Sequence, residues 1–238
     1  MNNIFRKNGY LNLSFIALVC LLSSCSTSPS VPVATKDSLT TSTADPLPSW
    51  NDSITKKAII SYVKDVTNTE SKNFIPVADR VATFDNDGTL WSEQPLYFQF
   101  FFAIDRIKAM AVNHPEWKNK QPYKAVLENN MQELMKQGEK GIVELVMATH
   151  AGITTDEFDK IVKDWITSAK HPTKGRLYTE LVYQPMLELI TYLKNNGFSV
   201  YIVSGGGIDF MRPWTERVYG ISKDKVIGSN IKTQYDFD

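Results

Sequence analysis

The stretch Val81-Ala-Thr-Phe-Asp-Asn-Asp-Gly-Thr-Leu-Trp91 places two carboxylates directly after a short apolar run. The residues from Val81 to Phe84 have the composition of a buried β-strand, and the Asp-Gly pair that follows is typical of a turn. Asp85 and Asp87 would then lie at the carboxyl end of that strand. Because two acids beside a buried strand are costly without a function, the stretch predicts both a fold and a site.

Strands and helices alternate around this stretch. The continuous apolar runs at 81–84 and 198–203 predict strands covered on both faces, as in a parallel sheet flanked by helices. Ligands of such sheets bind at the carboxyl ends of the strands, so Asp85, Asp87 and Ser204 should lie at one edge. The other elements expected around the sheet are helices over 54–66, 185–196 and 210–219, the last kinked or restarted at Pro213, and a weak strand over 225–228.

A block of helices separates the two strong strands. Apolar periodicity predicts helices over 96–112, 123–137 and 141–150, and the capping box Thr154-Thr-Asp-Glu157 opens another that reaches about Ala169. The predicted fold class is therefore α/β, a Rossmann-like parallel sheet with an inserted helical cap. The expected core domain comprises residues 51–90 and 180–238, and the expected cap comprises residues 91–179.

The composition fits a globular domain and argues against a nucleic-acid partner. The 238 residues are 42% hydrophobic and 22% charged, and 26 basic residues balance 26 acidic ones. No long run of lysine or arginine is present to bind a phosphate backbone.

The first 24 residues are predicted to be a signal peptide. Arg6 and Lys7 precede an apolar run over 11–22, which is shorter than the roughly 20 residues of a spanning helix. Leu22-Ser-Ser-Cys25 resembles the bacterial lipobox, whose cysteine receives the lipid. The Ser/Thr/Pro-rich residues up to Trp50 are expected to be a flexible linker. The predicted location is the bacterial cell envelope, with the exported chain held to a membrane by the lipid on Cys25.

Both strand ends resemble motifs of the haloacid dehalogenase (HAD) superfamily. Asp85-Asn-Asp-Gly-Thr89, after the strand at 81–84, resembles the first motif of that superfamily, and Ser204-Gly-Gly206 resembles the second. The helical block between them is similar to the inserted cap of the phosphoserine phosphatase-like branch. The resemblance implies a phosphatase that acts on small phosphorylated substrates.

The resemblance also implies roles for individual residues. Asp85 attacks phosphorus and forms a phosphoaspartate, and Asp87 protonates the leaving oxygen and then activates water. Two neighbouring carboxylates suit this division because their repulsion separates their proton affinities. Mg²⁺ is implied as cofactor, held by a side-chain oxygen of Asp85 and the backbone carbonyl of Asp87. Asn86 is expected to present only its backbone. The residues expected to hold the phosphoryl group or to order the loop around it are Gly88, Thr89, Ser204, Gly205 and Gly206.

Glu93 is a candidate for recognising the leaving group. It lies about one residue short of the position of the glutamate that meets the substrate's ammonium in phosphoserine phosphatase-like enzymes. We expect Glu93, with Trp91, to attract a cationic group on the leaving alcohol. The aromatic run over 97–102 is expected to be cap core. No zinc site is expected, because no metal-ligand spacing relates the three histidines, His114, His150 and His171.

The later motifs of the superfamily are not found in the sequence. A complete member needs a lysine and an acidic pair on later strands, whereas 34 residues follow Ser204, and Lys223, Lys225 and Lys232 stand too early to match. We therefore expect a truncated sheet with 81–84 as an exposed edge, and impaired turnover, as in a truncated reading frame or a fragment of an active enzyme. A phosphotransferase and a catalytically inactive, surface-anchored binding protein remain alternatives.

Overall fold

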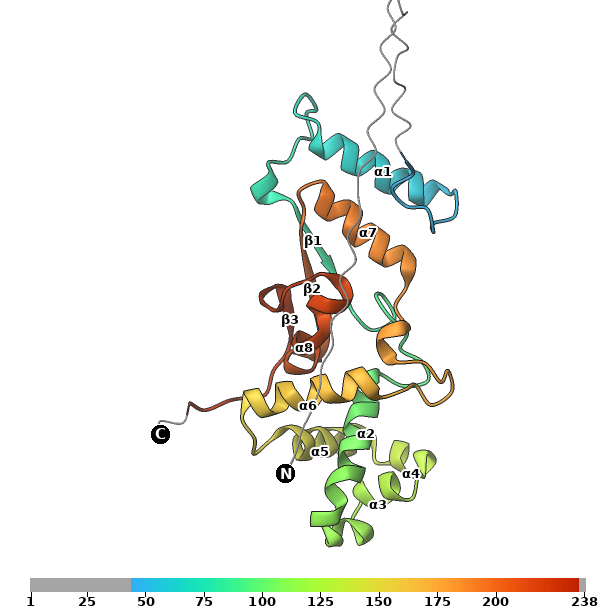
Figure 1. The fold of residues 1–238 in the computed structure, drawn as a ribbon, viewed down its shortest axis with the longest axis vertical. Helices are drawn as coiled ribbons and strands as arrows, with labels where there is room; N and C mark the ends of the chain where they lie inside the picture. Colours follow the sequence, from blue (N-terminus) through green and yellow to red (C-terminus); the bar gives the residue numbers. More distant parts are fainter. Residues whose placement is uncertain (1–43, 236–238) are drawn as a thin grey trace, which may run out of the picture. The chain divides into compact units, whose positions relative to one another are not determined.

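The computed structural model describes residues 44–235. The predicted signal peptide, Cys25 and most of the predicted linker lie outside this range. Short 3-10 helices occur at Val77–Asp79, Ala111–Asn113, Pro115–Asn119, Tyr178–Glu180 and Lys223–Lys225. The longer elements (Figure 1) are the helices α1 (Ile54–Thr67), α2 (Phe98–Met110), α3 (Tyr123–Leu127), α4 (Met131–Lys136), α5 (Gly138–His150), α6 (Thr155–Ser168), α7 (Gln184–Asn195) and α8 (Ile208–Tyr219), and the strands β1 (Val81–Phe84), β2 (Ser199–Gly207) and β3 (Val226–Ser229).

The strands form a parallel sheet in the order β1-β2-β3, which confirms the predicted α/β class. Val81 pairs with Ser199, and Ile202 pairs with both Phe84 and Val226. The register between β2 and β3 is irregular after Val203, where the glycine-rich end of β2 begins. Within the described residues β1 is an edge strand, as predicted.

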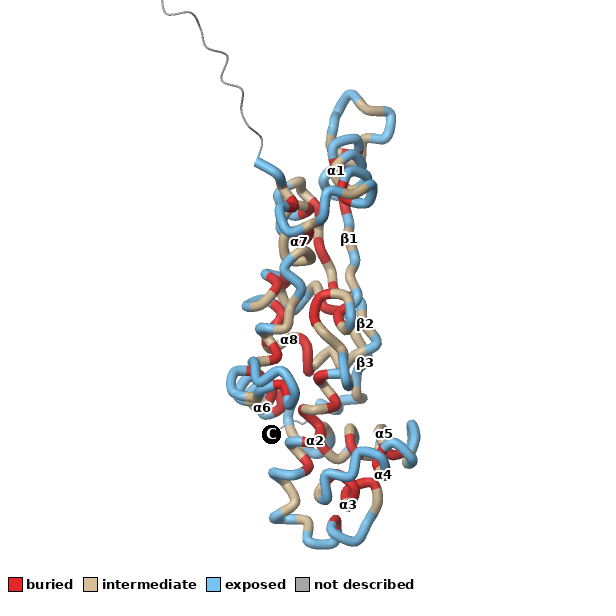
Figure 2. The backbone as a smooth tube through the Cα atoms, turned by 90° about the vertical axis from the view of Figure 1, so that its right-hand side faces the viewer, coloured by how far each residue is buried: buried red, intermediate tan, exposed pale blue. Residues whose placement is uncertain are grey.

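The sheet is covered on one face only, and the expectation that both faces are buried is wrong. Val200 and Ile202 are buried against residues of α7 and α8, whereas Val81 is 55% exposed and Val203 is 43% exposed. The cause is topological. Both crossovers step in the same direction across the sheet, and right-handed crossovers that do so place their helices on the same face. Figure 2 shows α7 and α8 on one side of the three strands.

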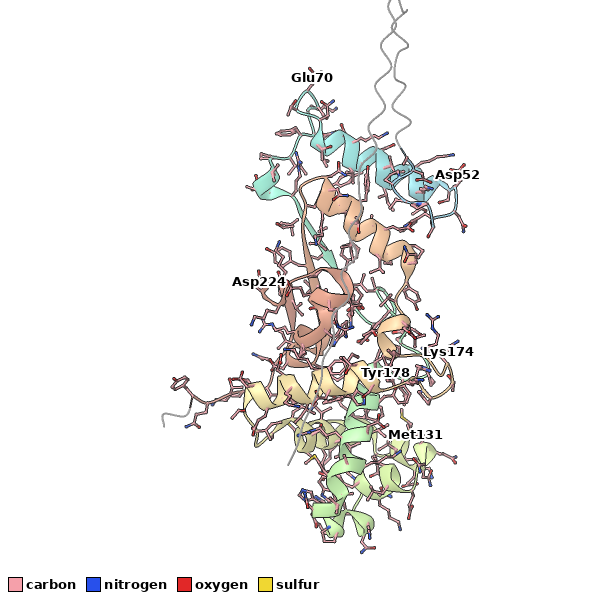
Figure 3. All side chains as sticks on the ribbon, in the orientation of Figure 1. Asp52, Glu70, Met131, Lys174, Tyr178 and Asp224 are labelled. Atoms are coloured by element: carbon pink, nitrogen blue, oxygen red, sulfur yellow. The ribbon has the colours of Figure 1, made fainter. Side chains whose placement is uncertain are left out.

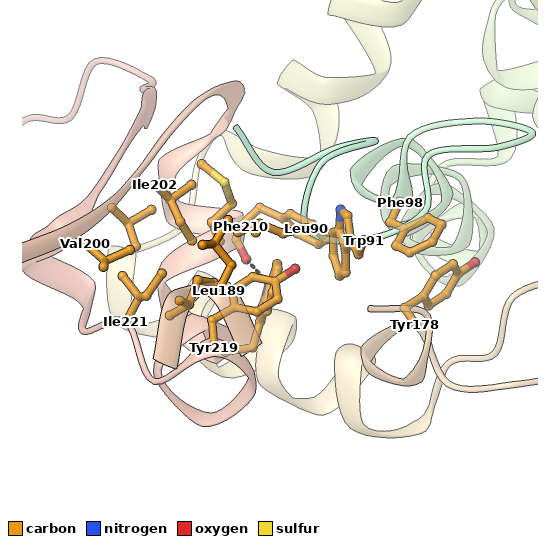
Figure 4. Packing of buried hydrophobic residues seen from close by; sticks show 14 of the residues in the cluster. Leu90, Trp91, Phe98, Tyr178, Leu189, Val200, Ile202, Phe210, Tyr219 and Ile221 are labelled. Atoms are coloured by element: carbon orange, nitrogen blue, oxygen red, sulfur yellow. Dashed lines mark hydrogen bonds between the residues drawn. The ribbon is translucent and has the colours of Figure 1, made fainter. Parts of the chain in front are cut away.

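The main hydrophobic core joins this covered face to the segment after β1. Figure 4 shows Val200, Ile202 and Ile221 at one end of the cluster and Trp91, Phe98 and Tyr178 at the other. Trp91 stacks on Trp214 of α8 at 4.4 Å between ring centroids. The first motif is therefore anchored by its own downstream residues in the core.

A second hydrophobic cluster is built by α2, α3, α4 and α5 and the 3-10 helix Pro115–Asn119. Helix α6 packs against α8, and its buried residues belong to the main core. Tyr178, labelled in Figure 3, contacts Phe98 of α2 and Trp165 of α6. The predicted capping box is confirmed at the start of α6, where Thr154 and Glu157 bond reciprocally.

Two helix predictions differ from the structure. The single helix expected over 123–137 is two short helices, because Asn129 adopts a positive φ of 53° and Asn130 caps α4 by accepting from the Glu133 N–H. The polar pair Asn129-Asn130 therefore acts as a break. Helix α8 continues through Pro213 as one helix, without a restart.

The folded part of the chain includes residues before Asn51. Leu47 is fully buried in the main core, and the Trp50 indole N–H donates to the Pro185 carbonyl at 2.8 Å. Asp45 accepts from Lys56 of α1. Across the described range, none of the helices combines the length and the apolar character that crossing a bilayer requires.

Candidate active site

The loop after β1 is a tight turn held by one carbonyl. The Asn86 carbonyl accepts from the N–H groups of Thr89 at 3.2 Å and Leu90 at 2.8 Å. Gly88 has a φ of +72°, a conformation that glycine adopts without a steric penalty. Asp85 is exposed and Asp87 is half-buried at this turn. One Asp85 carboxylate oxygen accepts from the Asn86 N–H at 2.7 Å, which fixes its orientation.

The side chain of Asn86 has a role that the sequence did not indicate. It is buried, and its amide oxygen accepts from the Tyr219 hydroxyl at 3.1 Å. The expectation that Asn86 presents only its backbone is therefore wrong. Tyr219 ends α8, so this bond ties the turn between the two aspartates to the helix that follows the second motif.

Asp87 lies where a carboxyl group is favoured in its protonated form. Burial raises its pKa above the ordinary value, the negative charges of Asp85 and Glu93 raise it further, and the hydrogen bond from the Trp91 indole at 2.7 Å opposes the rise. A raised pKa suits a group that must donate a proton. The Asp85–Asp87 pair thus has the asymmetry that the sequence predicted.

Glu93 lies over the turn, whereas Trp91 does not face the cavity. A Cβ atom added to Gly88 would stand 2.8 Å from the Glu93 carboxyl carbon, so glycine leaves room for that carboxylate. Trp91 is fully buried between Phe98 and Trp214. The part of the hypothesis that assigned Trp91 to cation recognition is therefore wrong, because its ring faces are covered by the core.

The second motif approaches the first at Gly206. The Cβ position of Gly206 lies 3.7 Å from a carboxylate oxygen of Asp87. The Ser204 Oγ accepts from the Gly206 N–H at 3.1 Å, which leaves the hydroxyl hydrogen available for a ligand. The structure thus brings Asp85, Asp87 and Ser204 to one edge of the sheet.

Two residues of the predicted phosphate site are turned to other partners. The Gly88 N–H donates to the Trp91 carbonyl at 2.9 Å, and the Thr89 N–H donates to Asn86. Neither residue lines the cavity beside the aspartates. Their evident role is to shape the turn.

A cavity of about 440 Å³ opens beside the two motifs. The core contributes Asp85, Asp87 and residues 204–206, and Glu93 adds a third carboxylate. No lysine, arginine or histidine of the described residues lines it. The cap helices contribute the remaining wall, formed by Tyr97, Gln99, Phe100, Ile142 and Val146.

Gln99 is the clearest wall residue that the sequence reasoning missed. Its side-chain oxygen accepts from the Gly207 N–H at 2.7 Å, and its amide nitrogen lies 3.4 Å from the His150 Nε2. A Cβ on Gly207 would stand 2.4 Å from that nitrogen, so a glycine is required by proximity. The available signal was Gln99 itself, a polar residue inside the aromatic run at 97–102.

The histidines serve packing, as expected. His114 stacks on Trp117, and His171 is buried with its Nε2 2.9 Å from the Gln94 carbonyl. Burial lowers the pKa of His150 to about 4. In the part of the chain that the structure describes, no three histidine, cysteine or acidic side chains are grouped as ligands for a metal ion.

The chain belongs to the haloacid dehalogenase-like hydrolase family, whose model matches residues 82–237. This match begins within β1 and includes both motifs and the cap. It confirms the predicted superfamily and identifies the chain as a hydrolase-family protein. No curated protein matches the sequence.

Two solved structures are similar to this chain. One is a phosphoserine phosphohydrolase-like protein from Francisella tularensis subsp. tularensis SCHU S4, with 18% identity, a TM-score of 0.33, and coverage of 63% of this chain and 57% of that chain. The other is a conserved, functionally unknown protein from Anaerococcus prevotii DSM 20548, with 14% identity, a TM-score of 0.44, and coverage of 73% and 67%. The chain therefore spans little more than half of the Francisella protein.

Proposed function

We propose that this protein is a phosphatase that hydrolyses small phosphate monoesters through a phosphoaspartate. The observation that carries the proposal is the pair Asp85 and Asp87, which lines one cavity with Ser204 at the carboxyl ends of β1 and β2. Family membership supports hydrolysis. The unequal environments of the two carboxyl groups support their different roles.

Asp85 is the proposed nucleophile. It is exposed to the cavity, and the bond from the Asn86 N–H holds one oxygen so that the other can attack phosphorus. Asp87, with its raised pKa, donates a proton to the leaving oxygen. It then accepts a proton from the water that hydrolyses the aspartyl phosphate.

Ser204 is the proposed donor to the phosphoryl oxygens. Its Oγ already accepts from Gly206, so its own hydrogen can be donated to a phosphoryl oxygen. Gly205 lines the cavity beside it and permits a close approach. Gly88 and Thr89 contribute by shaping the turn that carries Asp85.

Mg²⁺ is the proposed cofactor. The cavity offers hard carboxylate oxygens without a basic side chain among its described lining residues, which suits a divalent cation. Asp85 would supply a carboxylate oxygen and Asp87 its backbone carbonyl. The ion would neutralise phosphoryl charge. Since few protein ligands are available and no basic side chain assists, we expect weak Mg²⁺ binding and slow turnover.

The proposal is tested with p-nitrophenyl phosphate. We expect Mg²⁺-dependent release of phosphate that is abolished in Asp85→Asn and reduced at least about 100-fold in Asp87→Asn. Asp79→Asn, which changes an acid of the 3-10 helix before β1, should leave the rate unchanged. A rate that survives in Asp85→Asn would refute the nucleophile.

The lack of a basic side chain in the cavity also favours a second candidate, a catalytically inactive binding protein. Such a protein would bind phosphate esters with Mg²⁺ and show equal, background rates in the parent chain and in Asp85→Asn. Phosphoryl transfer to another alcohol is separated from hydrolysis by adding glycerol and measuring glycerol phosphate.

Glu93 is the proposed recognition group for a cation on the leaving alcohol. Its carboxylate lines the cavity, and its negative charge acts on Asp87. Glu93→Gln should lower kcat/KM for phosphocholine more than for phenyl phosphate. An equal change for both esters would end this hypothesis.

We also propose that the chain is an exported lipoprotein of the bacterial cell envelope. The support is the sequence alone, with Arg6 and Lys7, the apolar run at 11–22, and the lipobox that ends at Cys25. Cys25→Ser should move the protein from the membrane fraction to the soluble fraction. Retention of this variant in the membrane fraction would contradict lipidation as the anchor.

A further inference from the structure

The cap-side wall of the candidate active site is apolar. Helix α2 and the residue before it contribute Tyr97 and Phe100, and helix α5 contributes Ile142 and Val146. We call these four residues the apolar wall. Gln99 is the polar residue that the same helices add to the cavity, and its side-chain oxygen is already bonded to Gly207. The wall therefore offers contact area to an apolar group rather than hydrogen bonds.

The apolar surface continues from the cavity to solvent. Val143 is 52% exposed and Met147 is 43% exposed on α5, one residue beyond Ile142 and Val146. Residues three and four apart on a helix share a face, so this part of α5 is an apolar strip. Exposed apolar patches of this kind mark binding surfaces.

The charges around the cavity are of one sign. Asp85, Asp87 and Glu93 line it, and the described lining residues include no cation. A leaving group with its own carboxylate or second phosphate would lie near these acids without a counter-ion. In a site partly shielded from water such an unpaired charge is strongly disfavoured.

We propose that the substrate is the phosphate monoester of an apolar alcohol without negative charge, and that the apolar wall holds its alkyl or aryl group. This inference rests on the proposed phosphatase function and names its substrate class. Esters such as phosphoserine, whose alcohol carries a carboxylate, are excluded by the acids and by the missing counter-ion.

The test compares two esters of the same shape. Phenyl phosphate and 4-carboxyphenyl phosphate differ by one negative charge on the leaving group. We expect kcat/KM for phenyl phosphate to be at least about tenfold higher, equivalent to about 1.4 kcal/mol. Equal values for the two esters would overturn the proposal.

A lysine in the wall should reverse this preference. Val146→Lys and, separately, Ile142→Lys place a cation beside the leaving group, so 4-carboxyphenyl phosphate should gain at least tenfold relative to phenyl phosphate. Val112→Lys, at a position 82% exposed outside the cavity, is the matched control and should leave the ratio unchanged. Thermal unfolding identifies variants that fail to fold, and a folded wall variant with an unchanged ratio would contradict the proposal.

Binding separates this inference from the proposed function. Benzylphosphonate and 4-carboxybenzylphosphonate are not hydrolysed, and calorimetry with Mg²⁺ measures their affinities for the parent chain. If no ester is hydrolysed but benzylphosphonate binds at least tenfold tighter, the phosphatase proposal fails and the apolar subsite stands. If esters are hydrolysed but the phosphonates bind equally, the apolar subsite fails alone. If neither occurs, both fail.

Discussion

His150 shows how the environment of one residue can make stability depend on pH. It lies beside the site wall, where its ring pairs with Val146 and Gln99, and burial lowers its pKa to about 4 from an ordinary value near 6.5. The folded chain therefore holds it neutral at a pH where the unfolded chain protonates it. Stability from this difference is complete above pH 6.5 and is lost as the pH falls towards 4.

We predict that the stability advantage of the parent chain over His150→Gln shrinks by about 2 to 3 kcal/mol between pH 7 and pH 4.5. The variant removes the titrating ring, so the comparison cancels the protonation of the many carboxylates. Urea unfolding at both pH values gives the two free energies. A constant difference would show that His150 is accessible to protonation in the folded chain.

Tyr219 and Asn86 give a second prediction for a single residue. Tyr219→Phe removes the hydroxyl that satisfies the buried Asn86 amide oxygen, so unfolding free energy should fall by about 1 to 2 kcal/mol. Tyr192→Phe is the control, because Tyr192 is half-buried on α7 and has no comparable bond. Equal losses in urea unfolding would mean that the bond does not stabilise the turn.

At the level of elements, the sequence predicted regular structure better than its interruptions. The strand over 81–84, the capping box of α6 and the helix over 54–66 were read from periodicity and capping residues, which act locally. The break at Asn129-Asn130 was missed because apolar periodicity runs across it. Helix α8 was predicted to be disturbed at Pro213, but its packing against the core and α6 favours the continuous helix.

The turn at Gly88 carries the element-scale prediction. Gly88→Ala imposes a left-handed conformation on alanine and displaces Glu93, whose carboxylate is the end of a flexible side chain and moves at little cost. The loss of stability should therefore be about 1 to 2 kcal/mol, as for Gly175→Ala, where φ is +66° and no atom lies within 4 Å of the added Cβ.

The two alanine variants should differ in the site. Only Gly88→Ala moves the Glu93 charge away from Asp87, so the pKa of Asp87 should fall in that variant alone. Carbon-13 NMR of the aspartate carboxyl groups measures this shift, and urea unfolding compares stability. An unchanged Asp87 pKa would show that the glutamate keeps its place.

At the scale of the whole molecule, the open face of the sheet sets its behaviour in solution. Val203 is 43% exposed and Ile227 is 52% exposed, and they are paired in register on neighbouring strands. An apolar sheet face next to an edge strand favours association. The uncovered face was not foreseen, because apolar runs alone do not reveal the direction in which successive crossovers step.

We predict that Val203→Lys combined with Ile227→Lys reduces self-association without loss of stability, since both side chains already face solvent. Light scattering as a function of concentration, on a Cys25→Ser background, measures the effect. Ile54→Lys with Val112→Lys changes two equally apolar, more exposed residues elsewhere and should leave association unchanged. Equal effects of the two pairs would mean that the sheet face is not special.

The candidate site was predictable where it depends on the strand ends and not where it depends on the cap. Asp85, Asp87 and Ser204 follow from strands whose carboxyl ends meet at one edge. Gln99, Ile142 and Val146 reach the cavity only through the packing of α2 and α5 on each other and on the second motif. Such long-range placement leaves no local pattern in a single sequence.

The pairing of Val81 with Ser199 has a consequence for how the chain acquires its structure. During synthesis, β1 emerges with all of α2 to α6 between it and its hydrogen-bonding partner. Contacts so distant along the chain form late, because a long loop must close first. We expect the helices of the second hydrophobic cluster to assemble earlier, so that the two aspartates meet their serine only in the last stage of folding.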